Sequence, residues 1–455
     1  MSTPEFSTHV HHALQTLGKR VVRNPHIERL LFYERLCAQP ARNGRATPPS
    51  VELFLRRALR EFRTEHAEHA KLLTRRFQEQ ETAKEIAHSQ SISQETVNRN
   101  QQRAIRLFAG WLLEQEQAAQ QQRRAALLAS LPPASFGALV GVDALQKKLT
   151  GLLRRPELPW VLCLSGIGGI GKTSLVNQAL RNVLDPSPYR GIVWLTVPHD
   201  QPLTQRTMLA ELSRRLLPPT LPASERLAAL QTRLKQHAHL IVLDDVSTEL
   251  DDPAWVDWLH SFANPSRFVL CSRQLPATLA RAYLLPMGEM NAKAALALMS
   301  YQAREVGLEE SVPVLRKHAA ALYARTGGNP LALKLAVGLL HSWPITAILE
   351  ALEERSQPDI AALYTAIYQA SWQALSEDGQ RLLLAMPLVA AEGASLAQLR
   401  AISGLGAAAL RNAIRELHTR SLLDASGEAG DKRYSIHHLT RSFVRQHILR
   451  TPPHS

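Results

Sequence analysis

Apolar residues recur every three to four positions over residues 50–119, as they do along one face of a helix. Val51, Leu55 and Leu59 begin this series, and Phe108 and Leu112 continue it near its end. Glycine is missing from most of the stretch. The pattern predicts an all-helical N-terminal module, which we place at residues 1–130.

The segment Leu131–Ser135, of sequence LPPAS, interrupts this pattern. Proline lacks an amide donor and restricts the residue before it, so we interpret the segment as a linker. Beyond it, short apolar runs alternate with amphipathic segments, which predicts a mainly parallel sheet in an α/β domain at residues 136–285. The expected strands lie at residues 160–164, 191–197, 239–243 and 267–271.

Helical periodicity alone returns after about Pro286, and the predicted strands stop there. We expect one helical subdomain at residues 286–344. A further region at residues 345–455 is expected to begin with helices and to end in a short β-like pair and a final helix from about Thr440. The expected pair consists of residues 421–424 and 434–436.

One glycine-rich segment carries the strongest chemical signal, because GIGGIGKT at residues 166–173 fits the pattern G-x-x-x-x-G-K-[ST]. It follows an apolar strand and precedes an amphipathic helix, as this motif requires. Its backbone N–H groups and the helix N-terminus suit a phosphate. Lys172 is expected to reach the β- and γ-phosphates, and the Thr173 hydroxyl to bind Mg²⁺. The motif predicts an ATP or ADP site that also includes Gly166, Gly168, Gly169, Ile170, Gly171 and Ser174.

Three charged residues follow later strands. Asp244 and Asp245 end the apolar run HLIVL, and Arg273 follows the run FVLCS. Carboxyl ends of parallel strands meet at one edge of a sheet, so we expect these side chains beside the phosphate loop. Asp244 is expected to position Mg²⁺, Asp245 to orient or deprotonate the attacking water, and Arg273 to sense the γ-phosphate.

The order of these segments resembles that of the NB-ARC ATPases of the STAND class, which include plant disease-resistance receptors, the apoptosome scaffold and bacterial regulators. The resemblance covers about residues 136–450. Residues Phe136–Leu145, with Val140 and Gly141, resemble the segment that packs on adenine in that family. Val142 stands where the family usually has arginine.

Two further elements carry the resemblance. The sequence GGNPLA at residues 327–332 is similar to the family's G-x-P-L-A turn, which implies that Pro330 lies near the base. The sequence YSIHHL at residues 434–439 is similar to the Met-His-Asp element of the family's winged-helix subdomain. The resemblance implies that His437 contacts the ADP β-phosphate, and His438 stands in place of the family's aspartate.

The resemblance implies a switch in which bound ADP holds a compact state and exchange for ATP releases it, usually into a homo-oligomer. Hydrolysis would then be slow and would reset the switch. The chain continues only about a dozen residues beyond the winged-helix element, whereas relatives usually continue into sensing repeats. A sensor protein in trans, sensing by the N-terminal region, or a truncated form would each account for this.

The N-terminal module holds a segment with helix–turn–helix spacing near residues 66–110. Ile86 and Ala87 form a small apolar face, Ser93 is a candidate N-cap, and Val97 faces back. The segment resembles the promoter-reading region of sigma factors, although Gln90 and Ser91 replace the usual leucine and glycine. Lys71, Arg75 and Arg76 are candidates to contact the DNA backbone. The predicted DNA-reading side chains are Gln94, Asn98, Arg99, Gln102 and Arg103.

Charge and composition limit the kinds of partner and the cell compartment that we expect for the protein. The 455 residues carry a net charge of +13, and residues 1–130 hold 20 Lys and Arg against 13 Asp and Glu. This excess favours nucleic acid as a partner. Three widely spaced cysteines, and neither an export signal nor a membrane span, favour the cytoplasm. The clusters His9–His12 and His66–His69 offer no convincing third and fourth ligand, so we predict no metal there.

The sequence thus predicts a nucleotide switch whose N-terminal helix–turn–helix binds duplex DNA and regulates transcription. One alternative is a defence or assembly scaffold whose N-terminal bundle recruits a protein effector. Another is a DNA-remodelling or transposition-type ATPase with sustained turnover.

Overall fold

The structure, a computed structural model, divides into two compact units at residues 1–126 and 127–455. Each unit is described by itself. The structure describes residues 3–17, 24–38, 50–134, 137–155, 157, 159–185, 187–197, 204–246, 253–273, 282–353, 360–390, 393–427 and 431–449. Phe136, in the predicted base-binding segment, and Ser135, at the end of the predicted linker, lie outside these residues.

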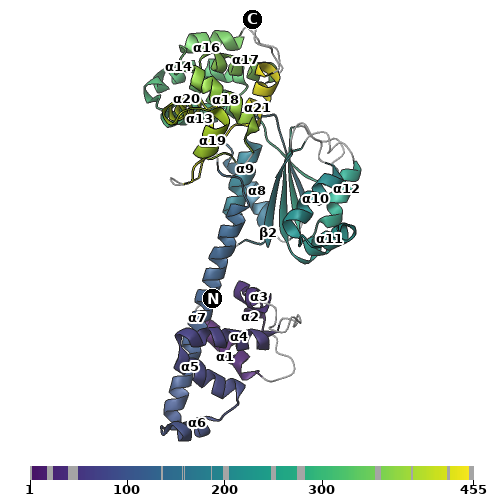
Figure 1. Cartoon of the computed structure of the whole chain (residues 1–455), viewed down its shortest axis with the longest axis vertical. Coiled ribbons are helices and arrows are strands. Elements are labelled where there is room, and N and C mark those ends of the chain that lie inside the picture. Colours follow the sequence, from purple (N-terminus) through teal and green to yellow (C-terminus); the bar gives the residue numbers. More distant parts are fainter. Residues whose placement is uncertain are drawn as a thin grey trace. The chain divides into compact units, whose positions relative to one another are not determined.

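The first unit is helical, as predicted (Figure 1). Its main core joins aromatic side chains from several helices: the Phe62 ring packs against Phe108 and Trp111, with centroids 5.1 and 5.7 Å away. A short π-helical segment, η1 (Thr74–Gln78), follows α5. The helices are α1 (Thr3–Gln15), α2 (Pro25–Glu28), α3 (Leu31–Ala38), α4 (Val51–Glu65), α5 (Ala67–Leu73), α6 (Ala83–Gln90) and α7 (Gln94–Ala129), the last of which ends in the second unit.

The second unit begins with an α/β domain built on a five-stranded parallel sheet of order β2-β3-β4-β1-β5. The fully buried strands read as continuous apolar runs because both faces of the sheet are covered. The strands are β1 (Val161–Ser165), β2 (Gly191–Thr196), β3 (His239–Val246), β4 (Arg267–Ser272) and β5 (Tyr283–Pro286).

Helices cover both faces of this sheet (Figure 1). Helices α8 (Asp143–Arg154) and α9 (Lys172–Val183) pack together on one face. The opposite face carries α10 (Gln205–Leu216), α11 (Arg226–Gln236) and α12 (Pro253–Phe262). A 3-10 turn, η2 (Ala223–Glu225), precedes α11.

The strand β5 corrects one expectation, because the predicted strands ended with Arg267–Cys271. It is an edge strand of four residues that pairs with β1 alone. Pro286 is tolerated at its end because an edge strand has one unpaired side. The short run YLLP gave too weak a signal to be recognised in the sequence.

The rest of the second unit is helical and shares one continuous apolar core. The helices are α13 (Ala292–Glu305), α14 (Val312–Thr326), α15 (Pro330–Leu339), α16 (Ile345–Glu353), α17 (Ile360–Gln373), α18 (Glu377–Ala385), α19 (Leu396–Ser403), α20 (Ala407–Thr419) and α21 (His438–Phe443). Short 3-10 turns are η4 (Glu309–Ser311) and η5 (Met386–Leu388), and the π-helical segment η6 (Val444–Ile448) continues α21.

A two-stranded antiparallel hairpin follows α18, α19 and α20, the order expected of a winged helix. Its strands are β6 (Asp424–Ser426) and β7 (Arg433–Ser435), so the first lies later than predicted. Leu422 and Leu423 instead turn into the core, where both backbone N–H groups donate to the Leu417 carbonyl at the end of α20.

Candidate functional site

The glycine-rich loop between β1 and α9 has the backbone that its sequence predicts. Gly169 and Gly171 adopt φ values of +74° and +102°, which favour glycine. A Cβ on Gly166 would lie 2.5 Å from the Met287 carbonyl oxygen. Ile170 is buried and fixes the loop on the sheet. The loop therefore needs glycine at these positions for both conformation and space.

Lys172 begins α9 and is buried. Its Nζ donates to the carbonyl oxygens of Gly166 at 2.6 Å and Ile167 at 3.1 Å. Burial lowers the pKa of this amine, so its charge lacks full compensation here. An anionic phosphate in the loop would supply that compensation.

The Thr173 hydroxyl donates to Asp244 Oδ1 at 2.9 Å, which joins the phosphate loop to the end of β3. The two residues meet although β4 separates β1 from β3 in the sheet. Burial raises the pKa of Asp244 to about 6, and the hydrogen bond from Thr173 opposes this shift. A hydroxyl beside a carboxylate is an oxygen donor set that suits Mg²⁺.

Asp245 and Arg273 form an ion pair at the same edge of the sheet. Arg273 Nε lies 3.1 Å from Asp245 Oδ1, and a second guanidinium nitrogen lies 3.3 Å from Oδ2. Asp245 has a φ of +65°, which is uncommon for a residue with a side chain and often marks a functional site. The sequence analysis predicted that both residues lie at this edge, but it did not predict the ion pair between them.

His437 comes from the far end of the chain and caps α21. Its Nδ1 accepts a hydrogen bond from the Leu439 backbone N–H at 3.2 Å, which leaves the proton of a neutral ring on Nε2. Burial lowers the pKa of His437 to about 4, although the nearby Asp245 carboxylate opposes the shift. The ring is therefore neutral at pH 7. Helix α21 begins two residues before the predicted Thr440 because His437 provides this cap.

One cavity of about 1290 Å³ joins these groups. It exceeds the roughly 300–1,000 Å³ typical of small-ligand sites. The sequence-predicted residues that line it are Val140, Gly141, Gly168, Gly169, Ile170, Gly171, Lys172, Thr173, Ser174, Asp244, Asp245, Arg273, Pro330 and His437. Gly166 is not among the lining residues, because it lies against Met287.

The segment before the phosphate loop lies between the sheet and the helical core. Gly141 has a φ of +77°, and a Cβ there would lie 2.7 Å from the Ala294 Cβ on α13. Val140 packs against the helical core, whereas Val142 packs on the sheet side. This places an apolar wall at one side of the cavity.

Two residues that the sequence reading missed also contact the phosphate loop. Asn329 and Tyr364 are both buried; Asn329 Nδ2 donates to the Gly168 carbonyl oxygen at 2.9 Å, and the Tyr364 hydroxyl lies 3.2 Å from the same oxygen. The Asn-Pro pair at the start of α15 is a helix N-cap signal, which marks Asn329 as a helix start but not as a contact of the phosphate loop. No local pattern marks Tyr364, which lies inside α17.

The predicted helix–turn–helix segment has the expected local geometry. Helix α6 ends at Gln90 and α7 begins at the predicted Gln94, with Ser93 Oγ accepting from the Thr96 N–H at 3.1 Å. Ser91, which replaces the usual glycine, has a φ of +55°. Ile86, Ala87 and Val97 form a small buried cluster. The predicted DNA-reading residues are exposed: Gln94, Asn98, Arg99, Gln102 and Arg103.

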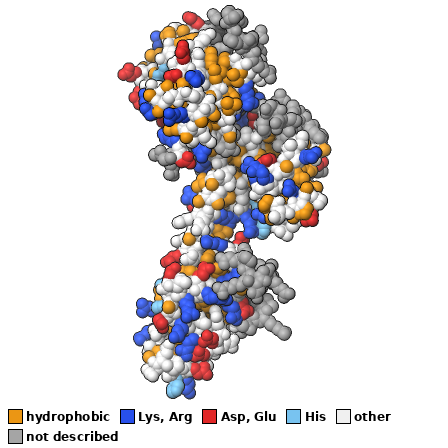
Figure 2. Space-filling model, viewed as in Figure 1, with side chains coloured by type: hydrophobic (Ala, Val, Ile, Leu, Met, Phe, Trp, Pro, Cys, Tyr) orange, Lys and Arg blue, Asp and Glu red, His pale blue; other side chains and the backbone are white. Residues whose placement is uncertain are grey.

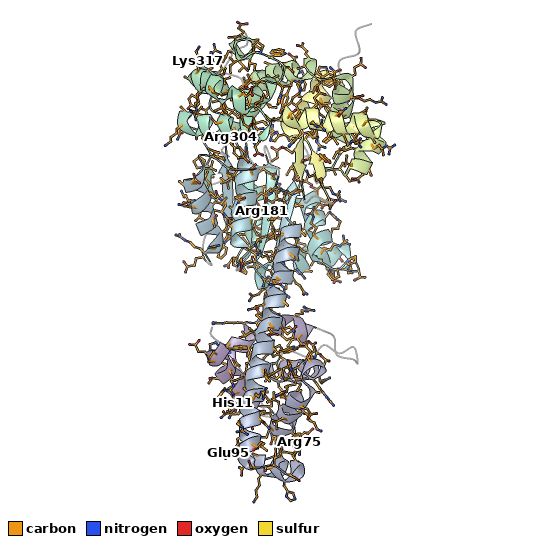
Figure 3. All side chains as sticks on the ribbon, turned by 90° about the vertical axis from the view of Figure 1, so that its left-hand side faces the viewer. His11, Arg75, Glu95, Arg181, Arg304 and Lys317 are labelled. Atoms are coloured by element: carbon orange, nitrogen blue, oxygen red, sulfur yellow. The ribbon has the colours of Figure 1, made fainter. Side chains whose placement is uncertain are left out.

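Two of the basic residues assigned to the DNA backbone have partners within the N-terminal unit. Arg75, labelled in Figure 3, lies 2.5 Å from Glu81 and also donates to Ser89. Arg76 donates to Gln101 at 2.6 Å and to the Glu81 carbonyl. These contacts hold the segment before α6, so both guanidinium groups are already engaged.

Two other kinds of feature, a metal-binding cluster and a membrane-spanning helix, are absent from the described ranges. No group of three or more His, Cys, Asp or Glu side chains there is arranged to hold a metal ion. Among the helices that the structure describes, none is long and apolar enough to cross a membrane.

Comparisons with known proteins agree with the geometry of the α/β domain. A family model for the NB-ARC domain matches residues 141–280. Disease resistance protein RPP8 of Arabidopsis thaliana is 29% identical over 224 residues, which cover 46% of this chain and 24% of that protein. Regulatory protein AfsR of Streptomyces coelicolor is 27% identical over 306 residues, 64% of this chain and 30% of that protein.

This chain spans less than a third of the length of either curated relative. Among solved structures, a STAND protein with a tetratricopeptide repeat sensor from Pyrococcus horikoshii matches with a TM-score of 0.45 and 18% identity. That match covers 70% of this chain and 43% of the other.

Proposed function

Because residues 141–280 form an NB-ARC domain, we propose that the chain is an ATP/ADP switch that gates DNA binding by its N-terminal module. The observation that carries the switch is the convergence of Lys172, Arg273 and His437 on one cavity. These residues come from the phosphate loop, the end of β4 and the last helical segment. A nucleotide there would contact elements that are far apart in sequence.

The ion pair between Asp245 and Arg273 supports two states of this site. A γ-phosphate would offer Arg273 a competing anion, and ADP would not. A ligand shifts an equilibrium only through contacts that differ between the states. We infer that ATP draws Arg273 away from Asp245, whose carboxylate would then accept a hydrogen bond from the attacking water in slow hydrolysis. Mg²⁺, held by Thr173 and by Asp244 through water, would supply charge compensation at the phosphates.

His437→Ala is expected to release ADP about tenfold faster than the unchanged protein, because a hydrogen bond to a charged phosphate contributes about 1.5–3 kcal/mol. Release of a fluorescent ADP analogue, followed by stopped flow, measures this. His341→Ala is the control, because this histidine is exposed in the same unit. Equal release rates from the two variants would rule out the proposed contact.

The proposal that the N-terminal module binds DNA rests on the first turns of α7. Five exposed side chains, the predicted DNA-reading set, lie on the helix that follows the α6–α7 turn. Asn, Gln and Arg can read base edges or hold phosphates. In the view of Figure 2, Lys and Arg side chains are interspersed with Asp and Glu over this unit. We therefore assign DNA contacts to these side chains rather than to a uniformly basic face.

Binding to duplex DNA tests the proposed role of the N-terminal module. The double variant Arg99→Ala/Arg103→Ala is expected to bind a labelled duplex pool about tenfold or more weakly in fluorescence anisotropy, because each lost phosphate or base contact contributes about 1 kcal/mol or more. Arg60→Ala/Arg63→Ala on α4 removes the same charge from exposed positions and is the control. Binding is measured with ADP and with a non-hydrolysable ATP analogue, at low and near-physiological salt.

The outcomes separate the candidate functions. Binding that depends on nucleotide and on Arg99 and Arg103 supports the switched regulator. Weak attraction that salt abolishes, equal in both double variants, contradicts it and favours a scaffold whose N-terminal bundle recruits a protein. The name of RPP8, a disease resistance protein, is consistent with that alternative. Rapid hydrolysis stimulated by DNA would indicate a remodelling ATPase.

Assembly is a further part of the proposal. ATP-bound copies are proposed to form a homo-oligomer, with a sensor protein in trans as a candidate source of the signal. Light scattering with each nucleotide tests the first point: the same mass with ADP and with the ATP analogue contradicts nucleotide-dependent assembly.

A further inference from the structure

Asn329 contacts the phosphate loop from the start of α15. Its side chain is fully buried. Its Oδ1 accepts hydrogen bonds from the backbone N–H groups of Leu331 at 3.0 Å and Ala332 at 3.3 Å. Because both groups need an acceptor, the oxygen must face the helix, and Nδ2 is left to donate. It donates to the Gly168 carbonyl oxygen at 2.9 Å.

Tyr364 reaches the same point from α17. Its hydroxyl donates to Asn329 Oδ1 at 2.7 Å and lies 3.2 Å from the Gly168 carbonyl oxygen. The side chain is 5% exposed. A Cβ on Gly169 would lie 2.1 Å from this hydroxyl and 2.9 Å from the Leu331 Cβ. The outer side of the loop therefore packs directly against α15 and α17.

These contacts determine the orientation of one peptide group. In a trans peptide the C=O and N–H bonds point in opposite directions. Holding the Gly168 carbonyl toward Asn329 therefore turns the Gly169 N–H to the opposite side, and both glycines line the cavity. We propose that Asn329 and Tyr364 are positioning residues that orient the Gly169 N–H toward a bound phosphate. This inference rests on the proposed nucleotide site.

The same contacts couple phosphate binding to helix packing. Helices α15 and α17 belong to the continuous core that also includes the residues of α18–α21. Movement of this core away from the loop would remove the hydrogen bond that Asn329 Nδ2 donates to the Gly168 carbonyl, and with it the Tyr364 hydroxyl that holds the Asn329 side chain. The peptide would then be free to rotate, and the phosphate would lose an oriented donor. By linkage, bound phosphate must stabilise the packed arrangement to the same extent.

Tyr364→Phe tests the proposal with little change in side-chain volume. We expect its affinity for a fluorescent ADP analogue to fall about three- to tenfold, as loss of a neutral hydrogen bond does. Tyr189→Phe is the matched control, because Tyr189 is also buried and donates to the Leu153 carbonyl at 2.7 Å, which is not part of the phosphate loop. Adenosine, measured by competition, is expected to bind both variants equally because it carries no phosphate.

Asn329→Asp is a second variant that keeps the helix cap and removes the donor. It also places a carboxylate beside the Gly168 carbonyl, so we expect a loss of about tenfold or more in ADP affinity. Thermal unfolding without ligand shows whether either variant folds.

Equal ADP affinity for Tyr364→Phe and Tyr189→Phe, or an equal loss for ADP and adenosine, would overturn the positioning role. If the unchanged protein itself binds no ADP, the proposed function fails instead. The two failures are thus distinguishable.

Discussion

Lys172→Ala is expected to lower the affinity for ADP and ATP about 100-fold or more, because charge-assisted hydrogen bonds to phosphate contribute about 1.5–3 kcal/mol each. The amine is already in the loop, where it donates to two backbone carbonyls. Equilibrium binding of a fluorescent ADP analogue, and the nucleotide content of the purified protein, measure the effect.

The unliganded variant should remain folded. Burial lowers the pKa of Lys172, so the charged amine is poorly solvated and its removal is not expected to reduce stability. Lys317→Ala is the control, because Lys317 is an exposed lysine on α14 (Figure 3). Tight ADP binding retained by a folded Lys172→Ala variant would refute the assignment of the phosphate loop.

Arg267→Met is expected to reduce the free energy of unfolding by about 3–5 kcal/mol, because it breaks a buried charged network. Arg267 begins β4 and is 1% exposed. Its guanidinium donates to the carbonyl oxygens of Leu152, Arg155 and Glu157, at and just after the end of α8. Its carbon Cζ also lies 5.4 Å from the centre of the Trp160 ring.

The loss would leave the buried Leu152 carbonyl, and the partly buried Arg155 and Glu157 carbonyls, without that donor. Urea unfolding followed by tryptophan fluorescence measures the change, since Trp160 and Trp194 lie beside and within the sheet. Arg214→Met is the control: Arg214 pairs with Glu211 on the surface and is 66% exposed, so its loss should cost less than about 1 kcal/mol. Similar unfolding curves for the two variants would contradict the structural role of Arg267.

The phosphate loop was predictable because its structure is local. The order strand, glycines, lysine and helix identifies the loop from neighbouring residues alone, although distant residues contact one of its peptide groups. Asp244 was also predictable. It directly follows a buried apolar strand, and the carboxyl ends of parallel strands meet at the sheet edge where the phosphate loop also lies. The start of α7 at Gln94 followed from the Ser93 cap in the same way.

Elements at edges and turns were less predictable. Strand β5 escaped notice because a four-residue edge strand needs little apolar sequence. The first wing strand was placed too early, because Leu422 and Leu423 have the composition of a strand but cap the end of α20. Arg75 and Arg76, candidates for contacts with the DNA backbone, have partners that the sequence did not reveal: Glu81, Ser89 and Gln101.

The sequence by itself determined the nucleotide loop, the α/β alternation and the helical character of both flanking regions, because each depends on residues a few positions apart. Only the tertiary structure decided which distant groups meet there. Arg273 pairs with Asp245, and Tyr364 reaches Gly168 across 196 positions. Periodicity identifies which face of a helix is buried. Which other element that face packs against depends on the packing of the whole core.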